Sequence, residues 1–203
     1  YLLIYLFAIK IGLVKSSTPI NNKITSKSRC ADVTFFGLSS SIVPASVTNI
    51  SNSIVVREGQ NVTLVCHGLG LPAPSITWSD AWDVVMEDKS IWQLPKIHRN
   101  MAGQYICTAS NACGNDSRKV DIDVQYPVEA TGKGETAFVA GGIVKTFTCP
   151  VNGNPEPNIE WYSEKTGGKI SCGKQYKTGE SGCYSCVASN SFGTAVNITH
   201  CLI

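Results

Sequence analysis

The chain contains two copies of one pattern of cysteine, proline and tryptophan residues. Residues 66–78 read CHGLGLPAPSITW and residues 149–161 read CPVNGNPEPNIEW, so both follow C-x3-G-x-P-x-P-x-I-x-W. A second pair, GQYICTASNACG at 103–114 and GCYSCVASNSFG at 182–193, follows G-x-Y-x-C-x-A-S-N-x-x-G. The segment between the tryptophan and the tyrosine is shorter in the second copy. A repeat that matches at so many positions predicts one structural unit that is folded twice.

The residues around these motifs alternate as β-strands do. Apolar residues alternate with others at 62–67 and at 119–124, a period of two that buries one face of an antiparallel sheet. The Pro-x-Pro steps cannot lie inside a central strand, so they mark the turn that enters the tryptophan strand. The Asn-x-x-Gly steps favour hairpin turns, because Asn and Gly tolerate positive φ. Short strands with frequent turns predict an all-β fold built of sandwiches.

The Cys…Trp…Tyr-x-Cys spacing of each copy resembles the immunoglobulin fold. Together with G-x-P-x-P-x-I-x-W and A-S-N-x-x-G, it is similar to the I-set domains of cell-adhesion proteins, over about residues 42–203. The resemblance implies two tandem immunoglobulin-like β-sandwiches, residues 43–126 and 127–203, of I-set or C2 type. In such a domain a disulfide joins the sheets, a tryptophan packs on it and a tyrosine forms a hydrogen-bonded corner. The residues that would do so are Cys66, Cys107, Trp78 and Tyr105 in domain 1, and Cys149, Cys186, Trp161 and Tyr184 in domain 2.

Some positions depart from the family pattern. The family has an Asp four residues before the corner tyrosine, where this chain has Met101 and Glu180. Met101 carries no charge, so the family's ion pair to a basic residue is not expected in domain 1. The shortened segment between Trp161 and Tyr184 leaves little room for both a C′ and a D strand. Pro127 follows the expected last strand of domain 1, so a short, semi-rigid link is expected there.

Beyond the two core pairs, the register of one hairpin predicts a third disulfide. If Cys186 faces Ile198 across antiparallel strands, then Cys183 faces Cys201 and both side chains point outward. Facing residues in such a pair have a Cα separation that suits a disulfide. The register therefore favours a Cys183–Cys201 bridge over a local bridge between Cys172 and Cys183.

The number of cysteines also indicates the compartment. Nine cysteines favour a disulfide framework in an oxidising compartment over free thiols in the cytosol. An odd number leaves at least one cysteine free or bonded to another molecule. Cys113 lies in the turn at the end where the chain enters domain 1, within reach of Cys30. The pairing of Cys30, Cys113 and Cys172 stays open.

The first residues have the features of a secretory leader. Residues 1–14, YLLIYLFAIKIGLV, are apolar except for Lys10 and Gly12 and are too short for a membrane span of about 20 apolar residues. They fit the apolar core of a truncated signal peptide, residues 1–17, followed by a linker at 18–42. Untranslated sequence read through is the alternative. We expect a secreted, extracellular chain, or a cell-surface chain if an anchor lies beyond Ile203.

Four sequons predict a glycoprotein. A sequon carries sugar where it is exposed in a secreted protein. The alternation around 197 and the position of 61 before a strand predict that both of these side chains point to solvent. The four acceptors are Asn49, Asn61, Asn115 and Asn197.

The sequence offers no catalytic constellation. The three histidines are scattered, and the GxSxG, P-loop and HExxH motifs are absent. His200 falls at an inward strand position, which favours a core histidine over a catalytic one. Net charge is +2, so no strong field attracts nucleic acid or an anionic membrane. We therefore expect no enzyme activity, cofactor, metal or small-molecule substrate.

The remaining candidates point to protein binding. Trp82 and Trp92 are candidate interface anchors, since tryptophan is enriched in binding hot spots, although Trp92 could equally pack under an edge strand. Lys96, His98 and Arg99 form a small basic group, either for a sulfated glycan or simply as surface.

The resemblance also implies a function. It implies adhesion-type recognition of a cell-surface or extracellular protein, or of a second copy, through the G-F-C-C′ sheet or a sheet edge. The alternatives are a soluble immune-recognition or hormone-binding protein, and a fragment of a receptor kinase or matrix protein. The fold hosts all of these functions, so the choice among them rests on analogy.

Overall fold

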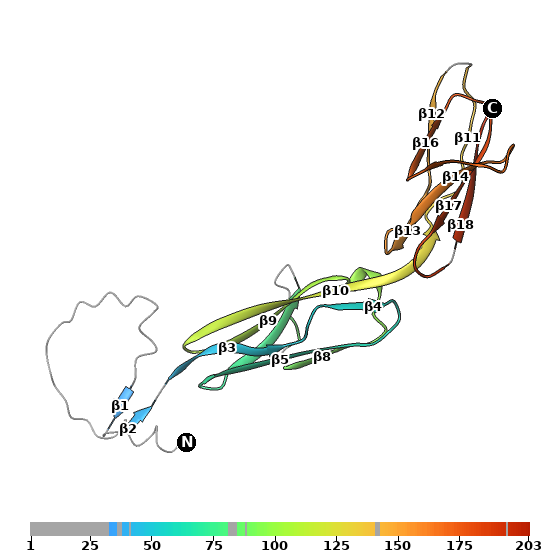
Figure 1. The fold of residues 1–203 in the computed structure, drawn as a ribbon. Coiled ribbons are helices and arrows are strands. Elements are labelled where there is room, and N and C mark those ends of the chain that lie inside the picture. The colour runs from blue at the N-terminus through green and yellow to red at the C-terminus, as the bar shows by residue number, and fades with distance from the viewer. Residues whose placement is uncertain are drawn as a thin grey trace, which may run out of the picture.

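The computed structural model describes residues 33–35, 38–40, 42–80, 85–87, 89–140, 143–193 and 195–203. Two β-sandwiches follow one another along the chain, domain 1 and domain 2, and lie end to end (Figure 1). Each has its own buried core, which includes Val124 on one side of the junction and Val128 on the other. The predicted tandem all-β architecture is confirmed. Ahead of domain 1, β1 (Val33–Phe35) pairs antiparallel with β2 (Leu38–Ser40).

Domain 1 consists of a back sheet and a front sheet. The back sheet has the order β3-β5-β8, and the front sheet has the order β10-β9-β6-β7, with β4 parallel to β10. In immunoglobulin lettering, β6, β7, β9 and β10 are strands C, C′, F and G. The strands are β3 (Val43–Ile50), β4 (Ile54–Arg57), β5 (Val62–Leu71), β6 (Ser75–Asp80), β7 (Val85–Glu87), β8 (Ile91–Leu94), β9 (Gly103–Asn111) and β10 (Gly114–Ala130).

Domain 2 repeats this plan with a smaller back sheet. Its front sheet has the order β11-β18-β17-β14-β15, and its back sheet is the pair β12-β16. Among the described residues, β15 and β16 are the strands between Trp161 and Tyr184, just as β7 and β8 are the strands between Trp78 and Tyr105. The strands are β11 (Thr136–Ala137), β12 (Lys145–Thr148), β13 (Val151–Asn154), β14 (Asn158–Ser163), β15 (Lys169–Cys172), β16 (Gln175–Thr178), β17 (Gly182–Ser189) and β18 (Ala195–Leu202).

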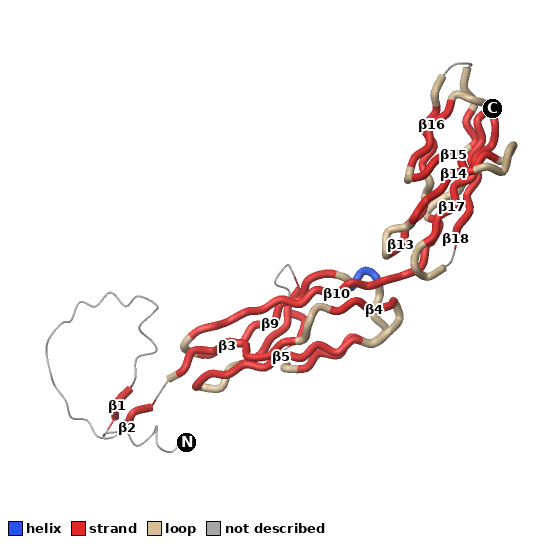
Figure 2. The backbone as a smooth tube through the Cα atoms, viewed as in Figure 1, coloured by secondary structure: helices blue, strands red, loops and turns tan. Residues whose placement is uncertain are grey.

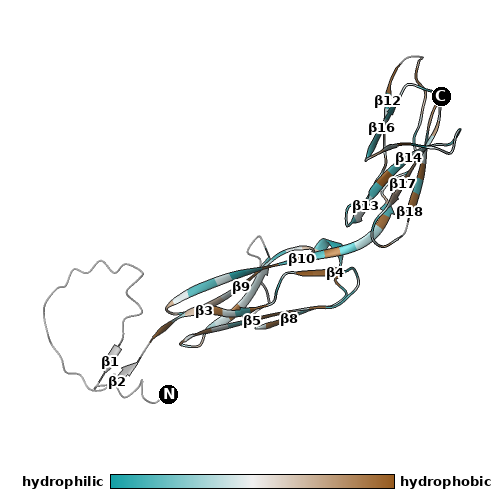
Figure 3. Cartoon of the chain, in the orientation of Figure 1, coloured by the Kyte–Doolittle hydropathy of each residue, from teal (hydrophilic) through white to brown (hydrophobic). Residues whose placement is uncertain are grey.

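The buried residues of both cores alternate along the strands with exposed residues, as the sequence predicts. Along β5, Val62, Leu64 and Cys66 are buried while Thr63 and His67 are exposed. Figure 3 shows the same mixture of hydrophobic and hydrophilic residues along β10 and β18. A strand with this pattern buries one face in the sandwich and leaves the other face in solvent.

The link between the domains differs from the expectation. Pro127 does not follow the last strand of domain 1 but lies within β10, which continues to Ala130. Beyond domain 1, β10 pairs with β13 through Tyr126 opposite Asn154 and Ala130 opposite Val151, with a bulge between. One strand is therefore both the last of domain 1 and the first of domain 2. The boundary between 126 and 127 stays a prediction inside that strand.

The Asn that recurs in the Ala-Ser-Asn motif of both repeats forms the same set of hydrogen bonds in each domain. Asn111 accepts a hydrogen bond from the Cys113 N–H, and its amide donates to the carbonyls of Val43 and Pro72. Asn190 repeats this arrangement: it accepts from the Phe192 N–H and donates to the carbonyls of Tyr126 and Pro155. In both copies the amide thus joins the first strand to the proline turn.

The glycine of C-x3-G makes room for this amide. A Cβ on Gly70 would come within 2.8 Å of the Asn111 Nδ2, and one on Gly153 would come within 3.2 Å of the Asn190 Nδ2. The motif residues therefore form one contact set, which explains why they recur together.

Candidate protein-recognition surface

The core cysteines and tryptophans occupy the positions that the family resemblance implies. Disulfides join Cys66 to Cys107 and Cys149 to Cys186, with Cα separations of 6.5 and 6.0 Å. Trp78 and Trp161 are fully buried, and each is the cross-strand partner of the second cysteine.

Both corner tyrosines bond to the chain four residues upstream. The Tyr105 hydroxyl donates to the Met101 carbonyl at 2.7 Å, and the Tyr184 hydroxyl donates to the Glu180 carbonyl at 2.8 Å. The corner needs only the backbone oxygen of residues 101 and 180. The departures in side chain at these two positions therefore leave it intact.

The third disulfide lies on the outer face of the domain 2 front sheet. Cys183 and Cys201 are cross-strand partners in the β17–β18 hairpin, with Cys186 opposite Ile198, and the structure joins them at a Cα separation of 4.1 Å. Cys183 and Cys186 have the C-x-x-C spacing of redox and metal motifs. They belong to separate disulfides, however, so they form neither a dithiol nor a ligand pair. Cys172 is free and exposed.

The predictions for Cys30 and for the secretory leader concern the first part of the chain. Cys30, the leader at 1–17 and most of the linker at 18–42 lie outside the described residues. Cys113 is itself disulfide-bonded.

The outer face of the domain 1 front sheet, which we name the front face, is nearly uncharged at its centre. Its registers align Ser79 with Ile106 and Lys119, and Thr77 with Thr108 and Ser117. Thr108 and Ser117 share a hydrogen bond of 2.8 Å. The alternating neighbours of β9 are buried, so Ile106 and Thr108 point away from the core. The front face consists of Thr77, Ser79, Ile106, Thr108, Ser117 and Lys119.

The corresponding face of domain 2 is more polar. One row aligns Cys172, Glu160, Val187 and Asn197 across four strands. Lys169 forms an ion pair with Glu160, and this hydrogen bond lowers the pKa of the Glu160 carboxyl. Asn197 is exposed in this row, so a glycan on it would cover part of the face.

The two predicted interface tryptophans have different outcomes. Trp92 is 8% exposed in β8, and its ring lies edge-on to Tyr105 at a centroid distance of 5.4 Å. The prediction of Trp92 as an interface anchor is therefore wrong, because its position opposite Leu64 directs it into the core. Trp82 lies outside the described residues.

Arg99 is the centre of a charged junction between the domains. It lies in the short helix η2 (Arg99–Met101), beside the point where β10 leaves domain 1 (Figure 2). Its guanidinium donates to both Glu58 oxygens at 2.6 to 3.1 Å and to both Glu129 oxygens at 2.7 and 3.0 Å. The guanidinium also lies 3.9 Å from the centroid of the Tyr126 ring. Glu129 follows Val128 of the second core, so Arg99 connects the two domains.

The ion pairs change the pKa values of the groups that form them. Hydrogen bonds from Arg99 lower the pKa of Glu58 to about 2 and lower the pKa of the exposed Glu129 as well. Hydrogen bonds to the two carboxylates raise the pKa of Arg99. All three groups are therefore charged at neutral pH, and bidentate pairs of this kind have a defined geometry.

Further contacts cross the same junction. The Asn154 amide donates to the Asp123 carboxylate at 2.6 Å and to the Val124 carbonyl at 2.8 Å. Arg57 lies 5.1 Å from the centroid of the Phe192 ring. Sequence reasoning noticed Arg99 only as part of a basic group. Its acidic partners lie 41 and 30 residues away, and no local signal links them.

All four sequon asparagines are exposed. Asn49 and Asn61 belong to the back side of domain 1, where Asn49 is opposite the exposed His67. Asn115 lies near one end of the front face, opposite Ser110. Whether each asparagine carries sugar stays a prediction.

The three histidines lie in different environments. His67 is exposed on β5, and His98 caps η2 and lies 3.4 Å from Glu58. His200 is 2% exposed in the core of domain 2. Among the described residues no group of three or more His, Cys, Asp or Glu side chains could hold a metal ion. No helix in the described part of the chain is both long enough and apolar enough to cross a membrane.

Comparison with known proteins supports the fold and its tandem arrangement. The family model described as "Immunoglobulin domain" matches residues 44–111. Limbic system-associated membrane protein of Rattus norvegicus is 31% identical over 169 residues, which is 74% of this chain and 50% of that protein. IgLON family member 5 of Homo sapiens is 34% identical over 124 residues, which is 60% of this chain and 37% of that protein.

A solved structure extends the match to both domains. The structure titled "Crystal structure of Dpr2 Ig1-Ig2 in complex with DIP-Theta Ig1-Ig3" matches with a TM-score of 0.71 and 25% identity, over 80% of this chain and 66% of that one. The chain spans half or less of the length of these curated relatives. By its repeated motifs, its disulfide-linked sandwiches and these similarities, the chain belongs to the immunoglobulin superfamily.

Proposed function

We propose that this chain is an extracellular recognition module of the cell-adhesion type, which binds a second immunoglobulin protein or another copy of itself and catalyses no reaction. The observation that carries the proposal is the front face of domain 1. It has a partly exposed Ile106 at its centre, which is bordered by hydroxyl groups and one lysine. An apolar centre with a polar rim is the common composition of protein interfaces.

The similarities support the same function. Limbic system-associated membrane protein is, by its name, a membrane protein, and the Dpr2 structure contains an immunoglobulin pair in complex with another immunoglobulin protein. Three disulfides among the described residues fit an oxidising, extracellular compartment. The domain 2 face is a weaker candidate, since Asn197 lies directly beside Val187 on it, whereas Asn115 lies near one end of the front face.

The test uses the secreted full chain with two matched variants. Ile106→Asp places a charge at the centre of the front face, and Val187→Asp places one at an outward position of β17 in domain 2. We measure self-association by sedimentation and binding of labelled protein to cells that display candidate immunoglobulin proteins. Ile106→Asp is expected to weaken binding at least about tenfold, because an unpaired charge is buried in the complex, whereas Val187→Asp leaves binding unchanged.

The outcomes separate the alternatives. A chain that stays monomeric at high concentration contradicts self-recognition and leaves a second protein as the partner. Equal effects of the two variants contradict the assignment to the front face. Binding is also expected to depend only weakly on salt, because a net charge of +2 gives little long-range steering.

A further inference from the structure

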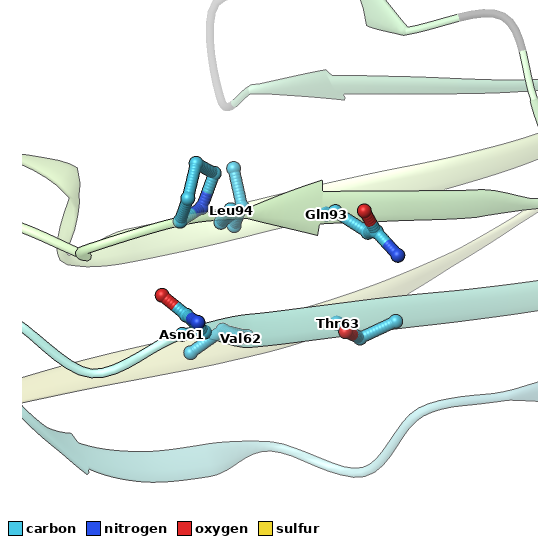
Figure 4. Close-up of a pocket in the computed structure, with 6 residues that line it drawn as sticks. Asn61, Val62, Thr63, Gln93 and Leu94 are labelled. Carbon is cyan, nitrogen blue, oxygen red and sulfur yellow. The ribbon is translucent and has the colours of Figure 1, made fainter.

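The back sheet of domain 1 has a hollow on its outer face where β5 begins and β8 ends. It has a volume of about 180 Å³ and opens to solvent (Figure 4). Val62 and Leu94, cross-strand partners that are 5% and 4% exposed, form its base. Its other lining residues are Asn61, Thr63, Gln93 and Pro95.

The hollow is lined by both essential residues of one sequon. Asn61 and Thr63 belong to Asn-Val-Thr, and Thr63 is the cross-strand partner of Gln93, so both side chains lie on the exposed face. The Asn61 Oδ1 accepts a hydrogen bond from the Lys96 N–H at 2.9 Å. That bond fixes the plane of the amide at the rim of the hollow and leaves the Nδ2, the atom that receives sugar, on the other side of the group.

We propose that Asn61 carries an N-linked glycan and that its first N-acetylglucosamine lies in this hollow, where it bridges β5 and β8. The inference depends on the extracellular route of the proposed function. In the transfer, the Asn61 Nδ2 bonds to the anomeric carbon of an oligosaccharide carried on a lipid pyrophosphate. The bond from that carbon to the pyrophosphate oxygen breaks, the amide loses one proton and the lipid pyrophosphate leaves.

The chemistry of the hollow suits this sugar. A pyranose ring has C–H groups on its faces and hydroxyl and acetamido groups at its rim. The exposed Pro95 ring offers an apolar surface, while Gln93 and Thr63 offer an amide and a hydroxyl for the acetamido group. Because the sugar is covalently attached, it reaches the hollow without the entropy cost of a separate molecule, and weak contacts suffice.

Such a contact stabilises domain 1, since the hollow exists only in the folded state. The experiment uses the full chain secreted from insect cells and trimmed to one sugar at each occupied site. Gln93→Ala is made in this protein and in the Asn61→Gln variant, and thermal unfolding of domain 1 is measured. We expect Gln93→Ala to lower the midpoint by roughly 4 °C in the glycosylated protein and by much less when Asn61 is replaced.

A distant sugar serves as the control. Asn197→Gln removes a glycan from domain 2, and the effect of Gln93→Ala is expected to remain unchanged in that background. An equal effect of Gln93→Ala with and without the Asn61 sugar overturns the inference. Glycopeptide masses give a second readout: sugar on Asn49 or Asn197 with a bare Asn61 overturns this inference alone, whereas no sugar at any sequon overturns the extracellular route as well.

Discussion

His200 is a titratable side chain inside the core of domain 2. Its ring packs against the rings of Phe147 and Trp161, at centroid distances of 5.1 and 5.5 Å. Its Nδ1 accepts a hydrogen bond from the Glu135 N–H at 3.1 Å, so the fold requires the neutral ring with its proton on Nε2. Burial lowers the pKa of His200 below 6.5, and the Glu135 carboxylate, itself paired with Lys145, opposes this only in part.

This position predicts that domain 2 loses stability in mild acid. The unfolded histidine binds its proton as the pH falls below 6.5, while the folded one does not, so protons favour unfolding. The free energy of unfolding is expected to be level above pH 6.5 and to fall by at most about 1.4 kcal/mol per pH unit below it. His200→Gln retains an acceptor without the titration and is expected to flatten this slope in denaturant unfolding at several pH values. An unchanged slope in the variant contradicts the assignment.

The outward disulfide gives a second prediction at the level of side chains. In a Cys172→Ser background, where the exposed free thiol is absent, Cys201→Ser is expected to make Cys183 reactive to a thiol probe in the folded protein. Cys183 lies on the outer face and its register partner would then be Ser. Labelling followed by peptide mapping checks it, and a Cys183 that stays blocked contradicts the pairing.

Single residues differ in how well the sequence predicts them. The register argument for Cys183 and Cys201 needed only one assumed pair, Cys186 opposite Ile198, and that pair is present. Trp92 could not be placed in the same way, because either face of β8 was compatible with the sequence. Its pairing with Leu64 of β5 decides which face is inward, and that pairing is a tertiary contact.

At the level of elements, Arg99 of η2 contacts residues of both domains at the junction with β10. Arg99→Gln removes the two bidentate ion pairs and the stacking on Tyr126. Loss of the pair with Glu58, the less exposed of the two carboxylates, is expected to cost domain 1 about 2 kcal/mol, since hydrogen bonds between charged groups are among the stronger ones. Denaturant unfolding measures this. The control is Lys96→Gln, an exposed basic residue whose side chain has no ion pair within the described ranges; a similar cost in both variants would argue against a specific role for Arg99.

The strands of both domains were predictable, whereas the junction was not. Alternation and repeated turn residues are local, so they indicate strands such as β5 and β17 directly. The partners of Arg99 come together only because the turn before β5 and the bulge of β10 approach η2 from distant parts of the sequence. For the same reason Pro127 suggested a break, although β10 runs through it at the bulge between Tyr126 and Glu129, where a missing N–H is tolerated.

For the whole molecule, the junction contacts predict a defined angle between the domains. Arg99, Asn154 and Arg57 each connect residues on the two sides of the junction. The wild-type protein is expected to give one narrow distribution of distances between spin labels on the two domains, and Arg99→Gln is expected to broaden it. Pulsed electron paramagnetic resonance measures these distances, and a broad distribution in the wild type contradicts a fixed junction.

The unbroken β10 also determines how the molecule would respond to a pull at its ends. A force on domain 1 reaches domain 2 directly through β10, because no flexible linker lies between the domains that could extend first. In domain 2, the Cys183–Cys201 disulfide links β18 to β17, and the Cys149–Cys186 disulfide links β17 to the opposite sheet. A force applied near Ile203 is therefore transmitted through covalent bonds, and β18 cannot be peeled away one hydrogen bond at a time. The two disulfides of domain 2 therefore limit how far its C-terminal strands can be extended under force.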